Sequence, residues 1–148
     1  NMNNPIIQLS YERTHIPNTF LEQMNVNKLS VYPLLNGFIT YEVIFSDFYG
    51  CLFNDFVRED HHLDGVIYNI RSWLAELEVC PFENGELNMT REKTPDEIRL
   101  TYTNRLKSGE KRILRIIFTK YCPKDIVDVV EKSLDGLLTE KERELVVA

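Results

Sequence analysis

The sequence has no long apolar run. Nothing in its 148 residues approaches the roughly 20 consecutive apolar residues that a membrane-spanning helix needs, because short runs such as Ile113–Leu114 and Ile116–Phe118 are interrupted by charged residues. The first residues are rich in Asn and Gln and lack the basic stretch and apolar block of a signal peptide. We therefore expect a cytoplasmic protein with no membrane segment.

Cysteine is scarce. Cys51, Cys80 and Cys122 are odd in number, widely spaced and flanked by apolar or aromatic residues. This pattern argues against a disulfide framework and is typical of small buried hydrophobic side chains in a reducing compartment. The Cys and His residues also lack the spacing of a zinc site, so no metal or other cofactor is expected.

Signatures of catalysis are missing as well. The sequence contains no nucleophile elbow of the G-x-S-x-G type, no glycine-rich nucleotide-binding loop and no H-E-x-x-H. An active site assembled from residues far apart in sequence stays open, since catalytic triads arise in that way. Whether the protein is an enzyme is uncertain from the sequence, which favours a non-enzymatic function.

What the chain does contain is enough apolar material for a core. Hydrophobic residues make up 43% of it, aromatic residues 11%, and Gly and Pro are few. A length of 148 residues fits one domain, and no linker, repeat or low-complexity tract divides the chain. We expect a single domain spanning residues 1–148.

The order of the expected elements predicts an α+β fold. Alternating or apolar runs predict strands at residues 5–11, 38–45, 48–53, 86–91, 98–103 and 111–120. One apolar stripe with helical spacing predicts the main helix and consists of Leu63, Val66, Ile67, Ile70, Trp73, Leu74 and Leu77. Pro123 is expected to open a second main helix with an apolar face, made of Ile126, Val129, Val130, Ser133, Leu134 and Leu137. The prediction is an antiparallel sheet of five to six strands packed with two main helices.

Three local predictions are less regular. A short helical turn is expected at residues 19–25, after Pro17. Pro33 would limit any strand at residues 28–35 to an edge of the sheet, and a turn is expected at Asn36–Gly37. A final short helix is expected to begin at Thr139.

Charge is sorted into blocks along the chain. Residues 42–90 carry ten acids and two bases, residues 91–124 carry ten bases and four acids, and residues 125–148 carry seven acids and three bases. The formal net charge is −6. An uneven distribution of charge of this kind affects which partners bind and how fast they associate, and it says little about the fold.

The densest cluster of polar groups runs from Asp55 to Asp64. Adjacent His61 and His62 with nearby carboxylates could hold a divalent ion or supply an acid and a base. However, neighbouring residues on a helix or strand do not face the same way, so at most one histidine would point into a shared site. The alternative is a polar segment that leads into the helix after it, where acids favour the helix dipole.

The basic block also has two interpretations. Its cations could project from the solvent side of the sheet as a nucleic-acid surface, or they could pair with acids on neighbouring strands and helices. The protein is acidic overall, with a pI of about 5.1, and it lacks an aromatic ribonucleoprotein motif. The composition therefore disfavours nucleic acid as a partner.

The order of the elements resembles that of bacterial immunity proteins, which neutralise toxin nucleases. The resemblance covers about 80 residues by pattern: a strand at 38–45, a helix carrying Trp73–Leu74, an acidic turn with an Asn84–Leu87 strand start, and strands at 98–102 and 113–118. It implies an inhibitor whose acidic face covers a basic toxin domain. The expected contact residues are Asp55, Glu59, Asp60 and Asp64, with Tyr49, Phe53 and Phe56 as aromatic anchors.

Other functions remain as alternatives. A small enzyme or metal-binding protein would use the acidic cluster around His61 and His62. A phage-borne inhibitor or DNA mimic would need carboxylates at phosphate-like spacing, which a neighbouring basic block opposes. Oppositely charged blocks on one chain also make a homodimer credible.

Overall fold

The protein forms one antiparallel sheet with two helices, in a computed structural model that describes residues 4–15, 23–46, 51–53, 59–78, 86–105 and 110–134. The main helix is α1 (Leu63–Glu78), and residues 124–134 form the second. The strands are β1 (Ile7–His15), β2 (Gln23–Leu34), β3 (Gly37–Ser46), β4 (Cys51–Phe53), β5 (Glu59–His61), β6 (Glu86–Lys93), β7 (Glu97–Arg105) and β8 (Lys111–Thr119). The predicted α+β class is confirmed, with six long strands and two three-residue strands.

Two meanders meet in the middle of the sheet. The strand order is β4-β3-β2-β1-β8-β7-β6, and β5 pairs with β3 beside that path. The first long strand and the last one, β1 and β8, lie next to each other, so the central pairing joins residues about a hundred positions apart. Chain entropy opposes contacts of such separation, and the apolar side chains along this seam offset that cost.

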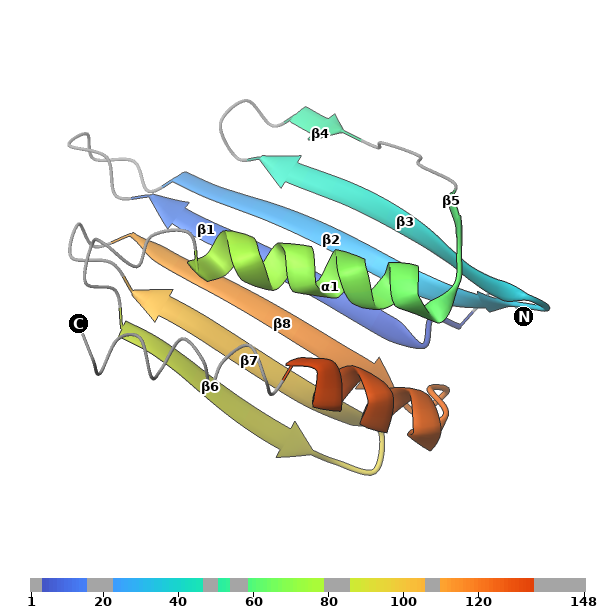
Figure 1. Ribbon diagram of the computed structural model, residues 1–148. Helices are drawn as coiled ribbons and strands as arrows, with labels where there is room; N and C mark the ends of the chain where they lie inside the picture. The colour runs from blue at the N-terminus through green and yellow to red at the C-terminus, as the bar shows by residue number, and fades with distance from the viewer. Residues whose placement is uncertain are drawn as a thin grey trace.

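Both helices lie on one face of the sheet (Figure 1). Helix α1 contributes Val66, Ile70, Leu74 and Leu77 to the core, each at most 1% exposed. The sheet contributes alternate residues, because successive side chains on a strand point to opposite faces. The set on the covered face is Ile7, Leu9, Tyr11, Leu29, Val31, Leu100, Tyr102, Leu114, Ile116 and Phe118.

The second helix buries most of the predicted face, since Val130 and Leu134 are buried and Ile126 packs against the core, but Val127 takes the place predicted for Val129. Val127, Val130 and Leu134 are buried, at a spacing of three and four residues, whereas Val129 is 46% exposed. The assignment of Val129 to the apolar face was therefore wrong. Because each residue turns the helix by about 100°, Val129 cannot share the face that Val127, Val130 and Leu134 fix against the sheet. Leu137 and Thr139 lie outside the described residues.

Strand β2 corrects three local predictions. Its first residues, 23–25, pair with the end of β1, so the helical turn expected at 19–25 is wrong for this part. Pro33 lies in an interior strand, but β1 pairs with β2 only up to Val31. The missing amide hydrogen of Pro33 therefore costs no β1–β2 bond. The turn after β2 is formed by Leu35 and Asn36, one position earlier than predicted.

The second face of the sheet carries polar side chains along most of its width. Lys28, Ser10, Arg115 and Thr101 form one row across four strands. No described helix packs on this face. It is referred to below as the open face, and the opposite one as the covered face.

Candidate functional site

The acidic segment predicted to bind a partner lies at one edge of the sheet. In β5, Glu59 is opposite Thr40 and Asp60 is opposite Ile39 of β3. Strand β5 then leads directly into the start of α1, as Figure 1 shows. The ladder to β3 fixes the backbone of Glu59 and Asp60, so these acids have a defined position at the edge.

Helix α1 begins immediately after this strand. The carbonyl oxygen of His62 accepts hydrogen bonds from the amides of Gly65 (3.0 Å) and Val66 (3.2 Å), which places His62 at the helix N-cap. Asp64 follows in the first turn and is exposed. A carboxylate there interacts favourably with the positive end of the helix dipole, which agrees with a polar segment leading into the helix.

The solvent side of α1 presents one large aromatic side chain. Tyr68 is 72% exposed and lies four residues after Asp64. Residues four apart are neighbours on a helix surface. Among the residues of α1 whose burial is described, the others that are exposed and follow Tyr68 are smaller or charged: Arg71, Ser72 and Ala75. Tyr68 and Asp64 are thus neighbours on the surface of α1. We name these two residues, together with Glu59 and Asp60 of the preceding strand β5, the acidic corner.

The structure brings part of the predicted contact set together. Glu59 and Asp60 adjoin Asp64 along the chain at the β5–α1 junction. Phe53 lies in β4, where it pairs with Ile44 near the C-terminal end of β3. Tyr49, Asp55 and Phe56 lie outside the described residues.

Tyr68 was missed by reasoning from the sequence. The helical periodicity identifies the apolar stripe alone, and Tyr68 lies next to Ile67, off that stripe. A large side chain off the buried stripe of an amphipathic helix is itself a signal of an exposed anchor.

A metal site was one alternative for the segment around His61 and His62. In that part of the chain no group of three His, Cys, Asp or Glu side chains is arranged to hold a metal ion. His62 is exposed. Within the same residues, no helix has the length and apolar character needed to cross a membrane.

Much of the basic block pairs with acids inside the fold. Arg91 Nε donates to Glu131 Oε1 (2.7 Å) and so joins β6 to the second helix. Arg115 Nη1 donates to Glu12 Oε1 (2.6 Å) and joins β8 to β1. For Arg91 and Arg115, these contacts confirm the interpretation that bases of residues 91–124 meet acids on neighbouring elements.

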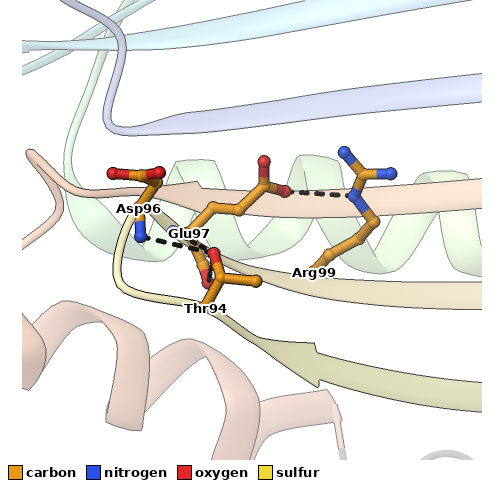
Figure 2. A network of polar contacts seen from close by, with 4 residues as sticks. All are labelled: Thr94, Asp96, Glu97 and Arg99. Carbon is orange, nitrogen blue, oxygen red and sulfur yellow. Dashed lines mark hydrogen bonds and ion pairs between the residues drawn. The ribbon is translucent and has the colours of Figure 1, made fainter.

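A further ion pair lies within a single strand, β7, on the open face. Figure 2 shows the Glu97 and Arg99 side chains on the same side of the sheet, with Arg99 Nε donating to Glu97 Oε2 (3.0 Å). The turn before them is fixed by Thr94, whose hydroxyl oxygen accepts hydrogen bonds from the amides of Asp96 (3.3 Å) and Glu97 (3.2 Å). Arg99 lies opposite the apolar face of its strand, as the alternation in the sequence predicted.

The open face is hollowed where its side chains are short. A depression of about 260 Å³ lies over β2, β1, β8 and β7. Ser10 and Ser30 line it together with the longer cations Lys28, Arg99 and Arg115. Glu12 contributes the one carboxylate among the residues that line it.

Cys122 is a free cysteine whose side chain is half-buried. Burial raises the pKa of its thiol to about 12, and the charge of nearby Asp125 adds to the rise. It lines a second hollow, of about 350 Å³, between the β6–β7 turn and the start of the second helix. A thiol with this pKa stays protonated at neutral pH and is a poor nucleophile.

The chain matches no protein-family model, and it has no significant similarity to a curated protein or to a solved structure.

Proposed function

We propose that this protein is a non-enzymatic binding module of the immunity or antitoxin type, which docks its acidic corner on a basic surface of a toxin domain. One observation carries the proposal: Tyr68 is 72% exposed, one helical turn from the exposed Asp64. A tyrosine beside carboxylates is the composition of an interface hot spot with an electrostatic surround.

Two further properties support this surface over others. The backbone of Glu59 and Asp60 is held by the ladder to β3, so ordering it costs little entropy on binding. In addition, the corner belongs to the stretch of residues 42–90, whose ten acids and two bases attract a basic partner from a distance.

The test begins with finding the partner. The tagged chain is used to co-purify proteins from its native host, and the captured protein is then expressed and purified. Association and dissociation rates are measured at low and high salt for the parent and for the triple variant Glu59→Lys, Asp60→Lys, Asp64→Lys.

The matched control carries the same change of charge elsewhere. Asp96 lies in the β6–β7 turn, Asp125 and Asp128 lie on the second helix, and all three are exposed. The variant Asp96→Lys, Asp125→Lys, Asp128→Lys therefore alters the net charge equally on elements other than β5 and α1. We expect the corner variant to associate at least about tenfold more slowly at low salt, and the control to stay within about threefold of the parent. Equal slowing of association in both variants would show a non-specific charge effect and would refute the acidic corner as the binding surface.

The aromatic anchor is tested separately. Tyr68→Ala should leave the association rate near that of the parent and raise the dissociation rate, since short-range packing acts mainly on dissociation. A loss of about 2 kcal/mol in binding free energy is expected for a hot-spot tyrosine. The control is Ala75→Ser, on the same helix surface. If Tyr68→Ala binds like the parent, Tyr68 is not part of the interface.

A further inference from the structure

Three buried polar atoms without a partner lie on the covered face of the sheet, on strands β1 and β7. They are the hydroxyl oxygen of Tyr11, Nε of Arg13 and Oδ1 of Asn104, and none of them has a hydrogen-bond partner among the described residues. Tyr11 and Asn104 are each 4% exposed. Because unsatisfied buried polar groups are few in native proteins, three of them on neighbouring rows of one face point to a group that binds there.

The strand register places these residues in two adjacent rows. Arg13 of β1 is opposite Arg112 of β8, which is opposite Asn104 of β7. Tyr11 lies two residues from Arg13 and therefore in the next row of the same face. The last turns of α1 lie above, since Asn104 Nδ2 donates to the carbonyl oxygen of Leu77 (3.0 Å).

That last bond fixes the orientation of the Asn104 amide. The Leu77 carbonyl can only accept, so the nitrogen of Asn104 must face it and the oxygen must face the other way. The Oδ1 atom of Asn104 is consequently a buried acceptor without a hydrogen-bond donor.

Arg13 is the unusual member of the group. Its guanidinium lies 5.6 Å from the centre of the Tyr11 ring, and no carboxylate among the described residues contacts it. Its cross-strand neighbour is a second arginine, although like charges directly opposite each other destabilise a sheet. Arg112 has a carboxylate partner, with its Nε donating to Glu110 Oε1 (3.1 Å).

We infer that this cluster is a binding site for a phosphate group that carries one protonated oxygen. The guanidinium of Arg13 and the hydroxyl of Tyr11 donate to its oxygens, and its P–OH donates to Asn104 Oδ1. Such a ligand satisfies all three atoms and supplies Arg13 with an anionic partner. The charge of Arg13 outweighs the partial negative charge at the C-terminal end of α1.

The molecule contains its own reporter for this site. Trp73 is the one tryptophan of the chain, and its ring meets the Tyr11 ring edge to face with centroids 6.4 Å apart. Binding at Tyr11 must change the surroundings of the indole. The experiment is therefore a titration of tryptophan fluorescence at pH 7 and constant ionic strength, with inorganic phosphate, sulfate or chloride as the probe.

Phosphate should give a saturable change, and sulfate should bind at least about fivefold more weakly. Sulfate has similar size but no proton at pH 7, so it leaves Asn104 Oδ1 without a donor. Chloride should give no saturable change. Absence of a saturable response to phosphate, or equal binding of sulfate, overturns the assignment of the ligand.

Substitutions test whether the fluorescence response to phosphate comes from this cluster. Arg13→Gln should weaken phosphate binding at least tenfold, while Arg99→Gln, which removes a guanidinium from the open face, should bind within about twofold of the parent. Tyr11→Phe removes one hydroxyl and keeps the ring, and it should weaken binding about threefold or more. If Arg13→Gln fails to fold, as judged by circular dichroism, Tyr11→Phe decides the matter. Parental affinity in a folded Arg13→Gln or Tyr11→Phe protein overturns the site.

Discussion

The two faces of the sheet are built from the same strands but meet different surroundings. On β8, Leu114, Ile116 and Phe118 are at most 1% exposed under the helices, whereas Ile113, Arg115 and Ile117 are only half-buried on the open face. The comparison shows that the helices, and not the strands, decide which side becomes the core. The open face keeps side chains of both kinds because it is in contact with water.

Polar groups differ between the faces in the same way. On the open face, Arg115 and Arg99 have carboxylate partners, and their side chains are 30% and 40% exposed. On the covered face, Tyr11 and Asn104 are almost fully buried and each has an unpartnered atom. Unsatisfied polar atoms cost more free energy when buried, so the covered face is where a bound group would stabilise the protein most.

The largest expected difference concerns two adjacent isoleucines of β8. Ile116→Ala removes a fully buried side chain and should lower the free energy of unfolding by about 2–5 kcal/mol. Ile117→Ala, one residue later on the open face, should cost about 1 kcal/mol or less. Urea unfolding followed by circular dichroism measures both. Similar losses for the two variants would mean that the open face is covered in solution.

A smaller effect is expected at Asn104. Asn104→Ala deletes the donor to the Leu77 carbonyl near the end of α1 and leaves a buried acceptor unpaired, which should cost about 1–3 kcal/mol. The control is Thr103→Ala, the preceding residue on the open face, where a change within about 0.5 kcal/mol is expected. Thermal and urea unfolding of both variants provide the measurement. If Asn104→Ala is as stable as the parent, the bond does not anchor α1.

The smallest effect is expected for an ion pair of the open face. Glu12 and Arg115 are 26% and 30% exposed, so a double-mutant cycle with Glu12→Gln and Arg115→Gln should give a coupling of about 0.2–1 kcal/mol. Salt should reduce it, because screening acts on charges in contact with water. A coupling above about 2 kcal/mol that is independent of salt would place this pair in a buried setting and would contradict the comparison.

Local periodicity predicted most of the elements. The apolar stripe from Leu63 to Leu77 matches α1 closely, and the alternation of residues 98–103 matches β7, because each pattern depends on neighbours in the sequence. The prediction failed where tertiary contacts compete with local preference. Val129 is apolar yet exposed, since the second helix is oriented by Val127, Val130 and Leu134.

The candidate site was predictable only in part. Glu59, Asp60 and Asp64 were identified from their density in the sequence, and the structure places them at one junction. Tyr68 became visible only from the exposure of its side chain. The cluster of Tyr11, Arg13 and Asn104 joins two strands, β1 and β7, whose residues lie about ninety positions apart, so no local pattern contains it.

The sequence by itself determined the α+β class, the position of α1 and the sorting of charge, because propensity, periodicity and net charge are properties of local composition. The tertiary structure decided which strands are neighbours and which face is covered. It also decided that much of the basic block pairs within the fold, as Arg91 does with Glu131 and Arg115 with Glu12. The reason is physical: pairing of β1 with β8 brings distant residues into register, and burial then sets the cost of each unpaired polar group.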